Sequence, residues 1–168
     1  MGRSHAAADE LVPVTVRTLA VDPVSNMPVV ILESTETESY LPIWIGIFEA
    51  NSIALQLEGV PMPRPMTHDL LMSLVKTLGS TIDAVVIHTL EENIFFAKLI
   101  VRCRDGSTVE VDSRPSDALA VALRCGASIM VTRSVLDEAQ LTALPDNEET
   151  IRSILKRLRP EDMGRWEM

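Results

Sequence analysis

The segment Asp112–Gly126, with the sequence DSRPSDALAVALRCG, is the stretch that decides the fold. From Pro115 to Cys125 the segment is almost entirely apolar, and only Asp117 and Arg124 carry charge there. A proline near its start suits the first turn of a helix, because the missing N–H would have no partner there. Arg114 precedes that proline and is therefore biased toward extended backbone, while the final glycine is a typical helix stop. The segment predicts a sharp strand-to-helix corner followed by a buried helix.

Apolar periodicity on both sides of this segment predicts further strands and helices. We expect strands over residues 12–21, 28–33, 40–46, 82–90, 93–103, 107–112 and 128–132, and helices over 48–58, 67–78, 115–125, 134–141 and 148–158. Hairpins and helices occur without strict alternation of strand and helix, which favours the α+β class. The predicted fold is a compact single domain with a mixed or antiparallel sheet.

A weak internal repeat relates two parts of the chain. A shift of 68 residues places Glu49 on Asp117 and Gln56 on Arg124. Both parts predict the same order of features, namely a strand, a sharp turn into a helix, a carboxylate near the helix start, an apolar helix and a glycine. The pattern predicts an internal duplication of a strand–helix unit, with a chance match between two apolar helices as the alternative.

Length and composition set the domain organisation. With 168 residues, the chain is long enough for one domain with a sizeable core. We assign this domain to residues 11–142, a disordered or tag-like N-terminus to 1–10, and a C-terminal helix and tail to 143–168. No apolar run reaches the ~18 residues of a membrane span. Two cysteines without metal-like spacing suggest a reduced, cytoplasmic protein.

The charge balance limits the ways in which this chain could contact nucleic acid. Its formal net charge is −9, whereas phosphate backbones are captured by clustered Lys and Arg. A nuclease with this composition would need a local basic cleft or a metal ion.

Charged and polar side chains gather at three predicted helix starts. The candidate site residues there are Glu49, Arg64, His68, Asp69, Arg114 and Asp117. In a phosphodiesterase, carboxylates could hold a divalent ion that activates water, a histidine could move a proton, and arginine could bind phosphate bidentately. The structural alternative is that Asp69 and Asp117 only cap their helices and that Arg114 pairs with Asp117, three residues on.

The remaining histidine and aromatic candidates are interpreted as structural. His88 lies within an apolar strand pattern and is expected to be a packed or strand-surface residue. Trp44 and Phe48 are expected in the core rather than as base-stacking residues, because no basic residues alternate with them.

Three ordered motifs carry a resemblance to a known family. They are LPIWIG at 41–46 followed by Glu49-Ala50, RPMTHDL at 64–70, and SRPSDA at 113–118. In these motifs the chain resembles the bifunctional nuclease domain family of bacteria and plants, over roughly residues 12–142. The resemblance implies a compact α+β domain with an internal duplication and members that self-associate. Plant members are associated with both DNase and RNase activity.

The first functional hypothesis is therefore a nuclease that hydrolyses DNA and RNA with little sequence specificity, with Mg²⁺ or Mn²⁺ as the candidate cofactor. His68 would be the general base, and Asp69 an orienting carboxylate. Glu49 and Asp117 would be catalytic or metal-binding carboxylates. Arg114 and Arg64 would bind phosphate. The alternative is a non-catalytic binding or regulatory module in a homodimer or larger homo-oligomer, in which the residues at these helix starts bind a small anion or a partner. In a third, purely structural interpretation they only hold the helices of an oligomer together.

Overall fold

The computed structural model describes residues 9–34 and 36–141. Its strands are β1 (Leu11–Val21), β2 (Pro28–Ser34), β3 (Ser39–Trp44), β4 (Thr81–Glu91), β5 (Ile94–Arg102), β6 (Thr108–Ser113) and β7 (Ser128–Thr132). Its helices are α1 (Ile47–Leu57), α2 (Thr67–Thr77), α3 (Pro115–Cys125) and α4 (Arg133–Ala139). The predicted α+β single domain is confirmed, and these elements begin and end within two residues of the predicted ones. The helix predicted at 148–158 lies outside the described residues.

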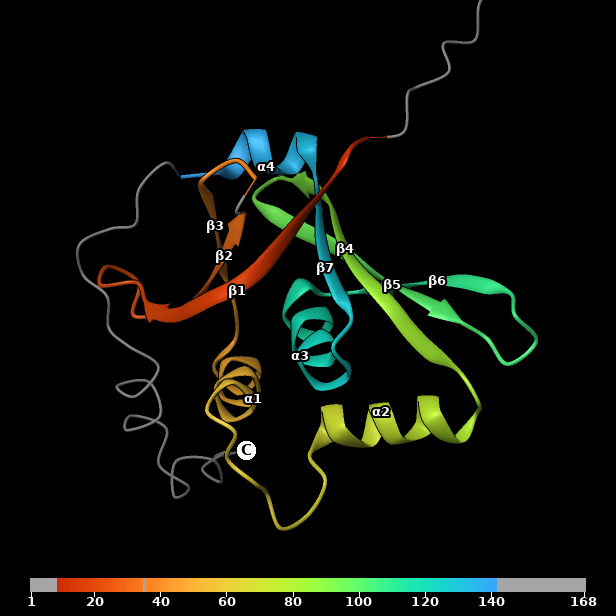
Figure 1. Cartoon of the computed structure of the whole chain (residues 1–168). Coiled ribbons are helices and arrows are strands. Elements are labelled where there is room, and N and C mark those ends of the chain that lie inside the picture. Colours follow the sequence, from red (N-terminus) through yellow and green to blue (C-terminus); the bar gives the residue numbers. More distant parts are fainter. Residues whose placement is uncertain (1–8, 35, 142–168) are drawn as a thin grey trace, which may run out of the picture.

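All seven strands form one mixed sheet, shown in Figure 1, with the order β3-β2-β1-β7-β4-β5-β6. Neighbouring strands are antiparallel except for β4 and β7, which are parallel. Helices α1 and α3 pack against each other, α1 also contacts β2, and α3 contacts β4, β5 and β7. Helix α2 packs against α3. The N-terminal parts of three helices are thereby brought close together.

Helix α3 is the centre of the core, as its sequence predicts. Residues Ala118–Ala122 are at most 1% exposed, and their small side chains alternate with larger ones, so that neighbouring elements can approach closely. Pro115 occupies the first turn. Gly126 ends the helix with φ +69°, a left-handed conformation that glycine adopts without steric cost.

The internal repeat is visible in the order of the elements. A three-stranded antiparallel unit precedes α1, and a second one precedes α3. Both helices contain 11 residues, and their starts at Ile47 and Pro115 differ by the same shift that the sequence indicated. Strand β7 lies between the two units, between β1 and β4. The two helix starts are therefore equivalent positions, occupied by Gly46 in one unit and Arg114 in the other.

Two aromatic residues that were expected in the core lie at the surface. Trp44 is 54% exposed, and Phe48 is about half exposed, so the prediction that both belong to the core is wrong. The preceding residues Leu41–Ile43 are buried, but Trp44 ends the edge strand where the chain leaves the sheet. Phe48 lies in the first turn of α1. None of the described helices is both long and apolar enough to cross a membrane.

The burial of α3 makes a prediction about stability. Leu119 is fully buried, whereas Leu78 is largely exposed. Leu119→Ala should lower the free energy of unfolding by about 2–5 kcal/mol, because it leaves a cavity in the core. Leu78→Ala is the matched control and should change it by less than about 0.5 kcal/mol. Urea denaturation followed by circular dichroism measures both, and equal effects would contradict the placement of α3 in the core.

Candidate functional site

Four of the six predicted site residues line one open pocket of about 350 Å³. Glu49 is in the first turn of α1, His68 is the second residue of α2, and Asp117 lies in the first turn of α3. Arg114 is the residue immediately before α3. The pocket is completed by Phe48, Asn51, Ser52, Met66 and Thr67. Residues up to 69 positions apart in sequence, Phe48 and Asp117, thus share one cleft.

His68 is the buried centre of this arrangement. Its Nε2 lies 2.9 Å from Asp117 Oδ1, and its Nδ1 lies 2.8 Å from Ser52 Oγ. Because an ionised carboxylate only accepts hydrogen bonds, the proton on this side of the ring belongs to Nε2. Ser52, His68 and Asp117 are the residue types of a hydrolase triad. Ser52 is only 3% exposed, however, so its hydroxyl is not placed to attack a polymeric substrate.

Arg114 bridges the carboxylates of the two related helices. Its Nε donates to Asp117 Oδ2 at 2.8 Å, and its Nη2 donates to Glu49 Oε1 at 2.7 Å. These hydrogen bonds, that to Asp117 first and that to Glu49 second, raise the pKa of Arg114 above its usual value. The predicted pairing with Asp117 is confirmed. The Arg114 side chain is nevertheless 66% exposed, so part of the guanidinium remains open to solvent.

Gly46 gives the Glu49 side chain the space for this contact. A Cβ added at Gly46 would overlap Glu49 Oε2. The first repeat thus has no side chain at the position where the second has Arg114. The single arginine can therefore reach both carboxylates without a competing cation from α1.

Arg124 was not predicted as a site residue, but it holds the other side of the network. Its side chain is 7% exposed, and it donates to Asp69 Oδ1 at 2.6 Å, Ser52 Oγ at 3.0 Å and the Ala120 carbonyl at 2.9 Å. The available signal in the sequence was a single cation late in an otherwise apolar helix. Because Ser52 also contacts His68, the polar contacts run unbroken from Glu49 to Asp69.

Asp69 has the capping role that the structural alternative assigned to it. Its Oδ2 accepts a hydrogen bond from the Met66 N–H at 2.9 Å at the start of α2. That hydrogen bond, followed by the one from Arg124, lowers the pKa of Asp69. Both are charge-assisted hydrogen bonds that stabilise the ionised carboxylate.

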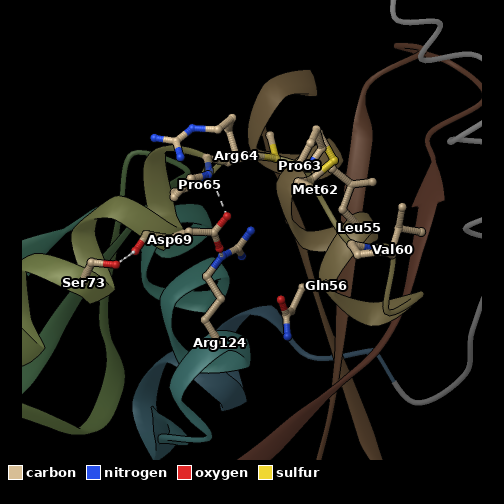
Figure 2. A pocket seen from close by; sticks show the side chains of 12 residues that line it. Leu55, Gln56, Val60, Met62, Pro63, Arg64, Pro65, Asp69, Ser73 and Arg124 are labelled. Carbon is tan, nitrogen blue, oxygen red and sulfur yellow. Dashed lines mark hydrogen bonds and ion pairs between the residues drawn. The ribbon is translucent and has the colours of Figure 1, made fainter.

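Asp69 and Arg64 do not line the pocket that contains His68. They line a second pocket of about 360 Å³ together with Arg124 and the proline-rich segment at 60–65, as Figure 2 shows. Arg64 is exposed. Its side chain reaches no hydrogen-bonding or ionic partner among the residues that the structure describes. The candidate residues thus fall into two groups on either side of the buried Ser52–Arg124 contact.

The candidate metal ligands face a cation. Mg²⁺ is commonly held by one or two carboxylates together with substrate phosphates, and Glu49 and Asp117 are ligands of that type. Both carboxylates contact the Arg114 guanidinium, and within residues 9–34 and 36–141 no cluster of three or more His, Cys, Asp or Glu could hold a metal ion. This donor set does not fit a resident divalent ion, because Arg114 already neutralises the carboxylates.

Comparison with known proteins agrees with the resemblance read from the motifs. Residues 30–143 match the bifunctional nuclease domain. The chain belongs to the bifunctional nuclease domain family. An uncharacterized protein of Mycobacterium tuberculosis is 38% identical over 156 residues, which cover 86% of this chain and 93% of the relative.

Plant relatives in this family are more distant. Bifunctional nuclease 1 of Oryza sativa subsp. indica and the bifunctional nuclease of Oryza minuta are each 27% identical over 104 residues. That match covers 60% of this chain and 31% of each plant protein.

The buried position of Arg124 generates a prediction about stability. Arg124→Met should destabilise the protein by about 3 kcal/mol, because it removes the cation from Asp69 and a donor from Ser52. Arg64→Met is the control, since Arg64 is exposed and should have almost no effect. Chemical denaturation of both variants checks this. Equal stability of the two would show that the contacts of Arg124 do not support the fold.

The pKa of Asp69 makes a second prediction about stability. Because the pKa is lower in the folded state, ionised Asp69 stabilises the fold above the unfolded value of about 3.9. The stability advantage of wild type over Asp69→Asn should therefore be constant at neutral pH. It should shrink as pH falls below about 4 and passes through the folded pKa. Urea midpoints measured from pH 7 to pH 2.5 test this, and a pH-independent difference would contradict it.

Proposed function

We propose that this domain hydrolyses phosphodiester bonds of DNA and RNA, with little sequence specificity, at the pocket that contains His68. The observation that carries the proposal is the convergence of Glu49, His68, Arg114 and Asp117 on one open pocket. They combine an exposed cation, two carboxylates and a histidine, which phosphoryl-group chemistry can use. The names of the rice relatives support the same activity.

Arg114 is the proposed phosphate ligand. A guanidinium binds two phosphate oxygens through parallel N–H donors, and the Arg114 side chain is mostly exposed and lines the pocket. A bound phosphate would compete with Asp117 and Glu49 for these donors. The released carboxylates would then be available to accept hydrogen bonds from an attacking water.

His68 is the proposed proton carrier. Its Nε2 proton is held against Asp117, at the wall of the pocket. From this position His68 in its imidazolium form could give the proton to the leaving oxygen, while Asp117 takes one from the attacking water. Residue type alone predicts that His68 is a general base. The hydrogen bond to Asp117 favours the general-acid role for the first proton transfer.

The proposal includes a divalent ion that is not resident in the free protein but binds together with the substrate. Glu49 and Asp117 are the side chains that would contact it, after phosphate draws Arg114 away from them. Such an ion would supply positive charge to the transferring phosphoryl group. Activity with added Mg²⁺ or Mn²⁺, compared with activity in chelator, tests this component separately.

The alternative function is a non-catalytic module in a homo-oligomer. It is favoured by the net charge of −9 and by a row of exposed leucines on and just after α2. These residues are Leu70, Leu71, Leu74 and Leu78. A contiguous exposed apolar face often marks an interaction surface. Self-association through this face is compatible with either function.

The test is cleavage of labelled single- and double-stranded DNA and RNA. His68→Ala and Asp117→Asn should lower the rate by about 10²-fold or more, as expected for removal of acid–base groups. Arg114→Gln should raise KM by about tenfold through loss of a charge-assisted phosphate contact. His88→Ala and Arg17→Gln are the matched controls and should cleave at the wild-type rate.

Circular dichroism must show that each variant is folded. If folded His68→Ala and Asp117→Asn cleave as fast as wild type, the observed activity belongs to another site or to a contaminant. If purified wild-type protein cleaves none of the four substrates, with or without metal, the non-catalytic alternative replaces the nuclease proposal.

A further inference from the structure

A third open pocket, of about 390 Å³, lies directly beside the one that contains His68. Arg114 lines both pockets. This third pocket is mainly apolar and is formed by Trp44, Ile94 and Phe95, together with Met27, Ile43 and Ile45. Its polar side chains include Asn93 and Ser116. A concave apolar surface with a few polar groups is typical of a site for a small organic group.

Trp44 is an exposed aromatic ring whose position is fixed. Its indole N–H donates to Asp22 Oδ2 at 3.1 Å. Asp22 is in turn held by Ser25 Oγ at 2.6 Å and by the Val24 N–H at 3.0 Å. More than half of the Trp44 surface stays open to solvent. Exposing such a large apolar ring is unfavourable, while the hydrogen bond limits its freedom to rotate away, so the ring is prepared for contact with another flat group.

The backbone of the β4–β5 turn, which also lines this pocket, is equally defined. The turn between β4 and β5 places Glu92 and Asn93 at φ +50° and +64°, the geometry of a tight hairpin turn. This turn brings Asn93 to the pocket next to the side chains of Ile94 and Phe95. An amide at such a position can donate to and accept from the edge of a planar ring.

We propose that this third pocket is a nucleobase subsite, in which a base stacks on Trp44 while the adjacent phosphate binds Arg114. The inference rests on the proposed function of Arg114 and adds the substrate class, namely a single strand with unpaired bases. Stacking on an exposed aromatic ring beside a cation is the usual way to bind single strands without sequence preference. A paired base in a duplex cannot place its face on Trp44 without leaving its stack.

The experiment uses the tryptophan itself as the probe. The chain contains two tryptophans, so the Trp166→Phe protein has Trp44 as its only one. This protein is titrated, in chelator, with a six-residue phosphorothioate DNA strand, with the abasic strand of equal charge, and with the duplex. We expect the base-containing strand to quench Trp44 fluorescence in a saturable manner. The abasic strand should not quench it, and the duplex should bind with lower affinity than the base-containing strand.

A second titration, followed by fluorescence anisotropy of a labelled strand, measures affinity in the variants. Trp44→Ala should weaken binding of the base-containing strand about tenfold, within the range for loss of one stacked base, and should leave the abasic strand unchanged. Trp44→Phe keeps a ring and should retain part of the affinity. Phe96→Ala is the matched control, because Phe96 is an exposed aromatic residue on β5 but does not line the pocket.

The outcomes separate this inference from the function on which it rests. Equal binding of both strands by wild type and Trp44→Ala would overturn the base subsite and leave the phosphate site of Arg114 standing. No binding of either strand by wild type would reject both. A change in oligomer size on Trp44→Ala, seen by sedimentation without a change in strand binding, would assign this surface to a second copy of the chain and overturn the inference.

Discussion

The arrangement of the helices around the pocket depends on one buried histidine, because both of its ring nitrogens require hydrogen-bond partners. His68 is buried, and its two ring nitrogens contact Asp117 on α3 and Ser52 on α1. An unsatisfied polar group at such a position would cost about 1–3 kcal/mol, so the three helices are held in one relative arrangement. Arg124 extends this constraint to Asp69. The pocket is therefore built from the ends of packed helices rather than from a mobile loop.

Arg114 is the part of this network that can change partners. In the free protein it neutralises two carboxylates within an acidic chain. A phosphate group would have to be a better ligand than these carboxylates, which limits the affinity for any phosphate alone. Contacts elsewhere on the substrate are then needed, and the aromatic pocket beside Arg114 could supply them. With the proposed activity, this acidic domain would bind short unpaired strands rather than attract duplexes through its overall charge.

Much of the fold could be predicted because the decisive signals are local. Pro115 and Gly126 define the two ends of α3 through backbone geometry alone, and alternation in β1 gives its buried face. The separation of Arg64 and Asp69 from the other candidates could not be predicted, since it depends on how α2 crosses α3. Trp44 was misplaced for a similar reason. Its apolar character indicates burial, whereas its exposure results from the point at which β3 leaves the sheet.

The most direct test of this account is the structure of the protein with a dinucleotide phosphorothioate bound at saturation. We predict the phosphate group on the Arg114 guanidinium, a base against Trp44, and His68 still in contact with Ser52. At least one of the contacts from Arg114 to Glu49 and Asp117 should be lost. A phosphate group bound elsewhere, with Arg114 still joined to both carboxylates, would contradict the account and show that these residues act as a structural clamp.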